Sequence, residues 1–433
     1  IHDCDFSTLD LSQLTGLTGT IRLDLNSNLT SVTNPTSSGI IDQYRIDNCN
    51  LSGTLDVSNL SGLGGLFQVY NNPNLNTILN PTSSQEFNRY WAYSCNLSGT
   101  LDLSNLTGLG GGFDVKVNTN LTNIIFPTSS FEYNSFAVRN TGIEVLDVRP
   151  CLGGFSGWSS FGCPNLTNIY FPDTISTIPF FNAYACPLLT TLDLSNVQIS
   201  SQCNIQNCGL ETLTFPTQSL VAGMKRLRLE GNNFSGSLDL SNIRWDDNGT
   251  GAGLFWIYNS PNLTNIDLFT DVTGSVTSVE LLQNSLTGTL DFTVWGTNGI
   301  GKVEGGNSGR VQLYSNNLDA VYFPTSSNEI SVFTLYGNNL TTLDYSMLTN
   351  VKGVISVRNN PLTTLNHPTF SGVVTSFGQS NTNITTLDFN IFSGSNDGIV
   401  MSLNDCSMTV GEVNKILVDL DATTWVGGTL NIG

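Results

Sequence analysis

The sequence predicts a mainly β solenoid, in which the chain winds into stacked coils that share one continuous parallel sheet. Segment 49–60 recurs almost unchanged as 95–106, 46 residues later, and a related unit at Phe67 lies between the copies. The repeat period is therefore about 23 residues. Each unit contains a short run in which apolar residues alternate, as in a half-buried strand. The segments between these runs are too short and too rich in Gly or Pro for regular helices.

The repeat unit resembles a leucine-rich repeat. The pattern L-x-x-L-x-L-x-x-(N/C)-x-L is matched by Ile41, Tyr44, Ile46, Cys49 and Leu51. Its Asn or Cys residue, here called the N/C position, recurs along the chain mostly every 21 to 24 residues, and the resemblance implies about 18 coils. We place it at Cys4, Asn28, Cys49, Asn72, Cys95, Asn118, Thr141, Cys163, Cys186, Cys208, Asn232, Ser260, Asn284, Asn316, Asn338, Asn360 and Cys406, with a blurred coil near Ser380 or Asn381.

Each coil is expected to contain one strand followed by a return path of one of two kinds. Segments 52–59 and 98–105 contain Ser-Gly-Thr-Leu-Asp and resemble the second short strand of plant-type repeats. Segments 121–128 and 166–173 contain Leu-Thr-Asn-Ile-x-Phe-Pro, in which Pro ends the strand and forces a turn. Two coils are longer, and their insertions, 244–248 and 295–304, are candidate functional loops, with neutral drift as the alternative.

Only residues 409–424 predict a helix. Thr409 and Glu412 form a capping box, and apolar residues such as Ile416 follow on one helical face. We therefore divide the chain into a solenoid over 1–403 and a last coil with a helix over 404–433, continuous with the solenoid and truncated. Residues 404–433 are similar to repeats of bacteriophage tail-fibre and other virion proteins and of some bacterial surface proteins.

Both ends of the sequence fall in mid-strand, at Ile1 and Ile432. Solenoids normally shield their terminal apolar edges with polar caps, so we expect the sequence to be the ordered part of a longer chain. The alternative is that the ends stack head to tail into a fibre.

Charge and composition exclude several functions. With 34 acidic and 15 basic residues the net charge is −19, so the chain lacks the clustered Lys and Arg that nucleic-acid binding needs. It contains no run of 18 apolar residues, so we expect no membrane insertion. The two histidines, His2 and His367, and the absence of G-x-S-x-G argue against a catalytic triad. We expect no enzyme activity, no cofactor and no metal, with a polysaccharide-active enzyme as a less favoured alternative.

Cysteines and aspartates both recur with the repeat. Seven of nine cysteines occupy the N/C position, so we expect reduced, buried thiols that satisfy backbone groups. A disulfide among Cys163, Cys186, Cys203 and Cys208 is the alternative. Five aspartates recur in the return strand and are expected to form turn hydrogen bonds, with a Ca²⁺ ladder as the less favoured hypothesis; they are Asp10, Asp56, Asp102, Asp193 and Asp239.

The candidate binding residues lie two or four positions before the N/C position, where side chains point away from the core. Exposed aromatic rings on a rigid sheet suit recognition of a protein or glycan, although stacking for sheet stability alone is the competing interpretation. The candidates are Tyr70, Trp91, Tyr93, Lys116, Arg139, Tyr184, Trp256, Tyr258, Tyr314, Tyr336 and Arg358. Five cations on this face suggest an anionic glycan or acidic protein as partner; they are Arg45, Lys116, Arg139, Arg228 and Arg358.

Together these observations predict a non-catalytic recognition or structural protein that is extracellular or on a virion surface. The similarity of residues 404–433 favours a phage tail-fibre or virion-surface component that binds protein or glycan through the solenoid face, within a virion assembly. A secreted bacterial adhesin and a protein that self-associates end to end into a fibre are the alternatives.

Overall fold

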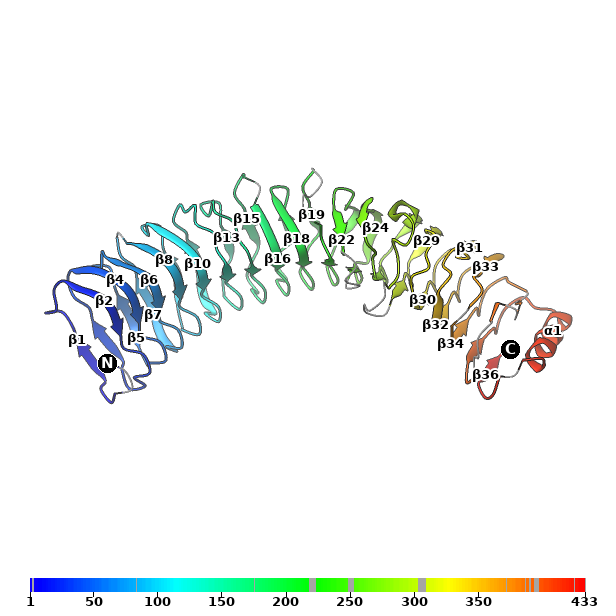
Figure 1. Cartoon of the computed structure of the whole chain (residues 1–433), viewed down its shortest axis with the longest axis horizontal. Helices are drawn as coiled ribbons and strands as arrows, with labels where there is room; N and C mark the ends of the chain where they lie inside the picture. Colours follow the sequence, from blue (N-terminus) through cyan, green and yellow to red (C-terminus); the bar gives the residue numbers. More distant parts are fainter. Residues whose placement is uncertain are drawn as a thin grey trace. The chain divides into compact units, whose positions relative to one another are not determined.

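A computed structural model describes residues 1, 4–82, 84–174, 176–217, 223–247, 253–302, 309–370, 372–385, 387–388, 391–392, 397–423 and 425–432. The chain forms two compact units, Ile1–Pro216 and Thr217–Gly433. Each unit is a parallel β-solenoid (Figure 1), which confirms the predicted mainly β solenoid class. The predicted boundary after residue 403 falls within the second unit and stays a prediction.

The main sheet of the first unit is built from nine described strands that pair in parallel in chain order. They are β2 (Leu17–Arg22), β4 (Ser38–Arg45), β6 (Leu63–Gln68), β8 (Glu86–Trp91), β10 (Gly108–Asp114), β12 (Ser135–Ala137), β14 (Trp158–Ser159), β16 (Ser176–Asn182) and β18 (Val197–Asn204).

The return paths of the first unit form short two-stranded parallel sheets. They are β1 (Thr8–Asp10) with β3 (Ser31–Thr33), β5 (Ser52–Asp56) with β7 (Asn74–Leu79), β9 (Ser98–Asp102) with β11 (Asn120–Ile125), β13 (Val145–Asp147) with β15 (Asn168–Tyr170), and β17 (Thr191–Asp193) with β19 (Thr212–Thr214). The second short strands predicted in 52–59 and 98–105 are therefore confirmed as β5 and β9.

The second unit repeats this plan. Its main sheet contains β20 (Arg226–Arg228), β23 (Leu254–Trp256), β26 (Ser278–Glu280), β28 (Arg310–Gln312), β30 (Ile330–Thr334), β32 (Val351–Ser356), β34 (Val374–Gly378), β35 (Val400–Ser402) and β36 (Thr429–Asn431). Its return pairs are β21 (Ser235–Asp239) with β24 (Asn262–Asp267), β22 (Arg244–Asp246) with β25 (Asp271–Thr273), β27 (Thr287–Asp291) with β29 (Asn317–Tyr322), and β31 (Thr342–Asp344) with β33 (Thr364–Asn366).

Alternation at the end of the strand separates core from surface. In β8, Tyr90 is buried, whereas its neighbour Arg89 is exposed and its neighbour Trp91 is half-buried. Successive side chains of a strand point to opposite faces of the sheet, so Arg89 and Trp91 share the face directed away from the core. We call this face of the main sheet the outer face.

The chain leaves each strand through a residue with left-handed backbone that directly precedes the N/C position. Asn71, for example, has φ of 55°. Gly and Asn adopt this conformation at the lowest cost, which explains their frequency here. These residues are Leu25, Asn48, Asn71, Ser94, Val117, Asn140, Gly162, Ala185, Asn207, Gly231, Asn259, Gln283, Ser315, Gly337, Asn359, Asn381 and Asp405.

The N/C side chain satisfies backbone groups at this turn. Asn72 Nδ2 donates to the carbonyl oxygens of Val69 and Ile46, both at 2.9 Å, and its Oδ1 accepts from the amide of Leu51 at 3.0 Å. In the next coil Cys95 Sγ donates to the Val69 carbonyl at 3.3 Å. Because buried backbone groups need partners, the repeat requires a polar group or a thiol here.

The N/C position was wrongly predicted in two coils. In the second coil Asn26 is fully buried and donates to Leu23 O at 2.7 Å, whereas Asn28 is exposed. Near the C-terminal end Thr382 is buried and takes the position assigned to Ser380 or Asn381. Polar residues cluster around both turns, so composition alone does not distinguish them; the left-handed residues Leu25 and Asn381 fix the register.

A column of aromatic side chains fills the core of the first unit. Adjacent rings lie 4.6 to 5.9 Å apart between centroids, in the order Tyr44, Phe67, Tyr90, Phe113, Phe136, Trp158 and Phe181. The Tyr90 hydroxyl donates to Asn80 Oδ1 at 3.0 Å. The rings add packing energy beyond burial, about 0.5 to 1.5 kcal/mol per pair.

The inserted segments contribute to the core. Trp245 in β22 is fully buried, and Trp295, in the short 3₁₀ helix η1 (Phe292–Trp295), donates from Nε1 to Phe269 O at 2.9 Å. Asn248, Val303 and Glu304 of the predicted loops lie outside the described residues. These tryptophans therefore give the longer coils a packing role.

The predicted helix is confirmed as α1 (Val410–Asp421). The Thr409 side chain and Glu412 make the reciprocal hydrogen bonds of a capping box, and Ile416 is the residue of α1 that is buried. Thr424, the predicted end, lies outside the described residues.

All nine cysteines are free thiols, so the expectation of reduced cysteines agrees with the structure and the alternative disulfide is not formed. Cys49, Cys95, Cys163, Cys186 and Cys208 are buried at the N/C position. The prediction of a buried thiol was wrong at the first N/C position, because Cys4 is exposed. It belongs to the first coil, which has a neighbouring coil on one side within this chain.

Candidate functional surface

All eleven predicted binding residues lie on the outer faces of the two main sheets, and none is in the core. Ten are half-buried and Arg358 is exposed. The first unit holds Tyr70, Trp91, Tyr93, Lys116, Arg139 and Tyr184, and the second unit holds Trp256, Tyr258, Tyr314, Tyr336 and Arg358. Their role in binding stays a prediction.

In the first unit the aromatic residues pack into two clusters. Tyr70 and Tyr93 stack with centroids 4.5 Å apart, and Lys116 Nζ lies 4.0 Å from the Tyr93 centroid. Further along, Phe161 and Tyr184 stack at 4.3 Å, and the Arg139 guanidinium lies 5.3 Å from Phe161. Stacked tyrosines cover one another's faces, so these pairs stabilise the sheet and offer a partner mainly their edges.

The second unit has a similar arrangement. Tyr314 and Tyr336 stack at 4.5 Å, with the Arg358 guanidinium 4.9 Å from the Tyr336 ring. The Arg228 guanidinium lies 4.8 Å from the Trp256 ring.

Tyr258 belongs to the same outer face and lies near two carboxylates. Burial, together with the charges of Glu230 and Glu280, raises the pKa of its hydroxyl. Tyr258 is therefore protonated at neutral pH, and a ligand there would meet an uncharged phenol.

Acidic neighbours neutralise most of the cations on the outer face. Arg45 lies 3.6 Å from Asp24 and 3.8 Å from Asp47. Lys116 pairs with Asp114, and Arg228 pairs with Glu230. Of the five predicted cations, Arg139 and Arg358 have no acidic partner within the described part of the chain. The local balance of charge therefore does not favour an anionic partner.

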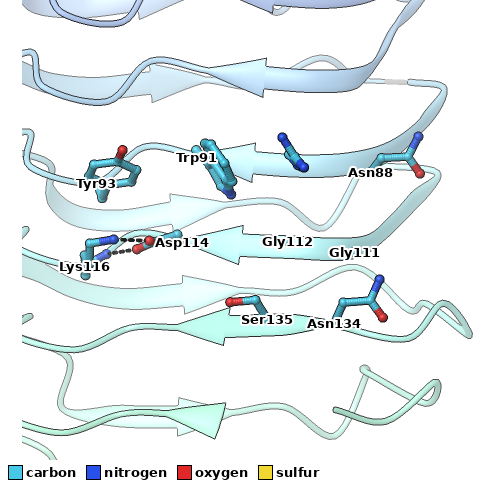
Figure 2. A pocket seen from close by; sticks show the side chains of 10 residues that line it. Asn88, Trp91, Tyr93, Gly111, Gly112, Asp114, Lys116, Asn134 and Ser135 are labelled. Carbon is cyan, nitrogen blue, oxygen red and sulfur yellow. Dashed lines mark hydrogen bonds and ion pairs between the residues drawn. The ribbon is translucent and has the colours of Figure 1, made fainter. Parts of the chain in front are cut away.

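Trp91 lines a hollow on the outer face (Figure 2), a groove of about 540 Å³ over β8, β10 and the start of β12. We call it the Trp91 groove. It is lined by Asn88, Arg89, Trp91, Tyr93, Gly111, Gly112, Asp114, Lys116, Asn134 and Ser135. The volume falls within the roughly 300 to 1,000 Å³ typical of small-molecule sites.

A missing side chain creates the groove. Gly112 pairs with Arg89 on one side and Ser135 on the other, so it occupies an outer-face position that carries side chains in the adjacent strands. In Figure 2 Trp91 and Ser135 lie on opposite sides of Gly112. A Cβ at Gly112 would lie 3.1 Å from Trp91 Nε1. The glycine therefore forms the floor beside the indole.

The sequence predicted part of this site. Trp91, Tyr93 and Lys116 were among the candidates, because aromatic and charged residue types stand out at outer-face positions. Gly112 was missed because a glycine offers no side-chain chemistry; the signal was the run Gly110-Gly111-Gly112 in a strand. Asp114 could have been found, because opposite charges two residues apart in a strand share a face.

The structure brings together no catalytic constellation around the one described histidine. His367 Nδ1 lies 2.6 Å from the hydroxyl of Tyr345, and burial lowers the pKa of the imidazole to about 4. His2 lies outside the described residues. Within the described ranges no three His, Cys, Asp or Glu side chains are grouped as a metal site.

The repeated aspartates make turn hydrogen bonds, as expected. In each, Oδ1 accepts from the backbone amide of a serine two residues later; at Asp56 and Asp102 the distance is 2.9 Å. Asp10, Asp193 and Asp239 make the same contact.

Comparison with known proteins supports the repeat assignment. Residues 24–144 and 117–225 match the BspA type leucine rich repeat region in six copies, which supports a leucine-rich-repeat protein. Such repeats are typical of bacterial surface proteins, and their solenoids are usually non-catalytic scaffolds. The match does not extend to residues 404–433. No curated protein matches the chain. No helix among the described residues is long and apolar enough to span a membrane.

Proposed function

We propose that the chain is a non-catalytic recognition protein of a bacterial cell surface, which binds its partner through the outer faces of its main sheets. The observation that supports the proposal is the arrangement of aromatic and cationic side chains: ten of the eleven predicted residues are half-buried, and two pairs of stacked tyrosines each lie beside a cation, Lys116 or Arg358. Side chains fixed in this way lose little conformational entropy on binding. The BspA-type repeats supply the bacterial surface context.

The return strands provide an internal comparison, because they also carry exposed tyrosines. Tyr170 in β15 is 43% exposed and Tyr322 in β29 is 55% exposed. Each lies outside the main sheet, and its strand ends beside an aspartate-bearing partner, Asp147 or Asp291. These rings are more exposed than the half-buried tyrosines of the outer face, so they are stringent controls for a claim about that face.

An adhesion assay tests the proposal. Beads coated with the full chain are applied to glycan arrays, bacterial cell walls and extracellular-matrix proteins. We expect capture by at least one surface and a loss of about tenfold or more in the double variant Tyr93→Ala/Tyr336→Ala. The matched control Tyr170→Ala/Tyr322→Ala should bind like wild type. Equal losses in both variants would contradict a specific role for the outer face.

A virion-surface or fibre-forming role, inferred from the sequence of residues 404–433 alone, is a second proposal. It predicts end-to-end association. Sedimentation velocity over a range of concentrations is the measurement, with growing linear oligomers expected; a monomer at all concentrations would count against the fibre.

A further inference from the structure

We propose that the Trp91 groove binds a pyranose unit of an uncharged glycan, whose hydroxyl accepts a hydrogen bond from the Trp91 indole. This inference rests on the proposed recognition function and names the class of ligand.

The two tryptophans on the outer face, Trp91 and Trp256, differ in one neighbouring residue, and this difference supports the proposal. Trp256 Nε1 donates to Ser278 Oγ at 3.0 Å. Ser278 pairs with Leu254, two residues before Trp256, and Gly112 pairs with Arg89, two residues before Trp91. Gly112 is therefore the register equivalent of Ser278.

The replacement of this serine by glycine has two consequences. The indole N–H of Trp91 has no hydrogen-bond partner within the described part of the chain, and the space above Gly112 is open. An indole nitrogen is a donor only, so the groove offers a fixed donor to an acceptor brought by a ligand. At Trp256 the same donor is already satisfied.

The other lining groups point to a ligand rich in hydroxyls. Asn134 and Asn88 provide amides that both donate and accept, Ser135 provides a hydroxyl, and all three are exposed. Arg89 adds donors and lies 4.8 Å from the Trp91 ring. A sugar ring donates and accepts at many points, and its C–H groups pack against aromatic surfaces.

Charge distinguishes an uncharged glycan from an anionic one. Lys116 is held by Asp114 within the groove, so its cation is matched by a carboxylate. The net charge of the chain, −19, repels anions at long range. An acidic sugar would gain one cation, Arg89, while facing Asp114.

The test uses chitotetraose, cellotetraose, maltotetraose and mannotetraose as probes, titrated into the full chain by calorimetry and followed by tryptophan fluorescence. We expect at least one to bind. Trp91→Ala and Gly112→Ser should each weaken that binding by about tenfold or more, because the first removes the donor and the second occupies it. Gly112 has no positive φ, so serine fits the backbone, as Ser278 does.

Two further variants complete the test: one is a control that should not affect binding, and the other should create a new site. Tyr170→Ala, in the return strand β15, should leave the affinity unchanged. Ser278→Gly frees the Trp256 indole and should add a second, weaker site for the same probe. Unchanged binding in Gly112→Ser, or no binding of any probe by wild type, would overturn the inference. If the beads still adhere through the outer face in that case, the recognition function stands while the sugar assignment fails.

Discussion

At the residue scale, the N/C position explains why Asn and Cys alternate along the chain. Asn72 serves its own turn and the preceding coil, whereas Cys95 makes one short contact to the preceding coil, at Val69 O. Either side chain therefore donates a hydrogen bond to a buried backbone carbonyl. Leaving a buried backbone group without a partner costs about 1 to 3 kcal/mol, so small apolar residues are disfavoured here.

This account predicts a graded response at Asn72. Asn72→Ala should lower the free energy of unfolding by about 3 kcal/mol, because several buried groups lose partners, and Asn72→Cys should cost about half as much. Urea denaturation followed by circular dichroism measures both. Asn74→Ala, on an exposed side chain, is the control and should stay near wild type. A cysteine as damaging as alanine would contradict the role of the thiol.

His367 gives the chain a predictable dependence on pH. Burial lowers its pKa from 6.5 to about 4 in the folded chain. Protonation therefore favours the unfolded state, and the contribution to stability is complete above the unfolded pKa and falls as the pH drops from 6.5 towards 4. Between about pH 7 and pH 4 the wild type should lose on the order of 2 kcal/mol more than His367→Gln. Urea denaturation at pH 7 and at pH 4 measures the loss of stability in each protein. An equal loss in wild type and in His367→Gln would contradict this prediction.

At the scale of elements, β10 contains two neighbouring glycines with different roles. Gly111 has φ of 59°, and a Cβ there would lie 2.1 Å from Asn88 O. Gly112 lacks this strain and borders the groove. The pairing of β10 with β8 shifts register between Leu109 and Gly112, so Gly111 forms a bulge that only glycine fits.

Substitutions should separate these roles. Gly111→Ala should lower the free energy of unfolding by about 2 kcal/mol or more, because the backbone must move away from the carbonyl. Gly112→Ser should change stability little, since one side chain, Trp91, must shift slightly. Thermal unfolding of the two variants is the measurement. If Gly112→Ser destabilised the chain as much as Gly111→Ala, Gly112 would be required for the fold and not only for the space in the groove.

Sequence predicted the strands and the N/C turns because both follow directly from residue types. Alternation in β8 and the cysteines at 49 and 95 are examples. It did not predict the aromatic column: the repeat pattern places Tyr44 at an apolar position, but a pattern does not show that the rings of successive coils, such as Tyr90 and Phe113, stack on one another. It missed the groove for a related reason: Gly112 matters through the space it leaves between strands that are distant in sequence.

At the scale of the whole molecule, the thiols report on the integrity of both solenoids. Cys4 is exposed and Cys406 is partly exposed, whereas the other seven cysteines are buried. Burial raises the pKa of Cys49 to about 11 and that of Cys95 and Cys151 to about 12. Buried thiols with raised pKa values react slowly with alkylating reagents.

Mass spectrometry after iodoacetamide treatment tests this pattern. In the native chain Cys4 should be modified first and Cys406 next, while Cys49, Cys95 and Cys151 react only after unfolding. All nine should be available in denaturant. A tryptic peptide pair joined through Cys163 and Cys186 would show that a disulfide forms after all.

The central claim is that the outer face, and not the return strands, meets the partner. Hydroxyl-radical footprinting of the full chain, free and bound to the surface or glycan that captures it, measures this most directly. The account predicts slower oxidation of Trp91 and Tyr93 on binding, with Tyr170 and Tyr322 unchanged. Protection of Tyr170 and Tyr322 with Trp91 and Tyr93 unaffected would contradict it.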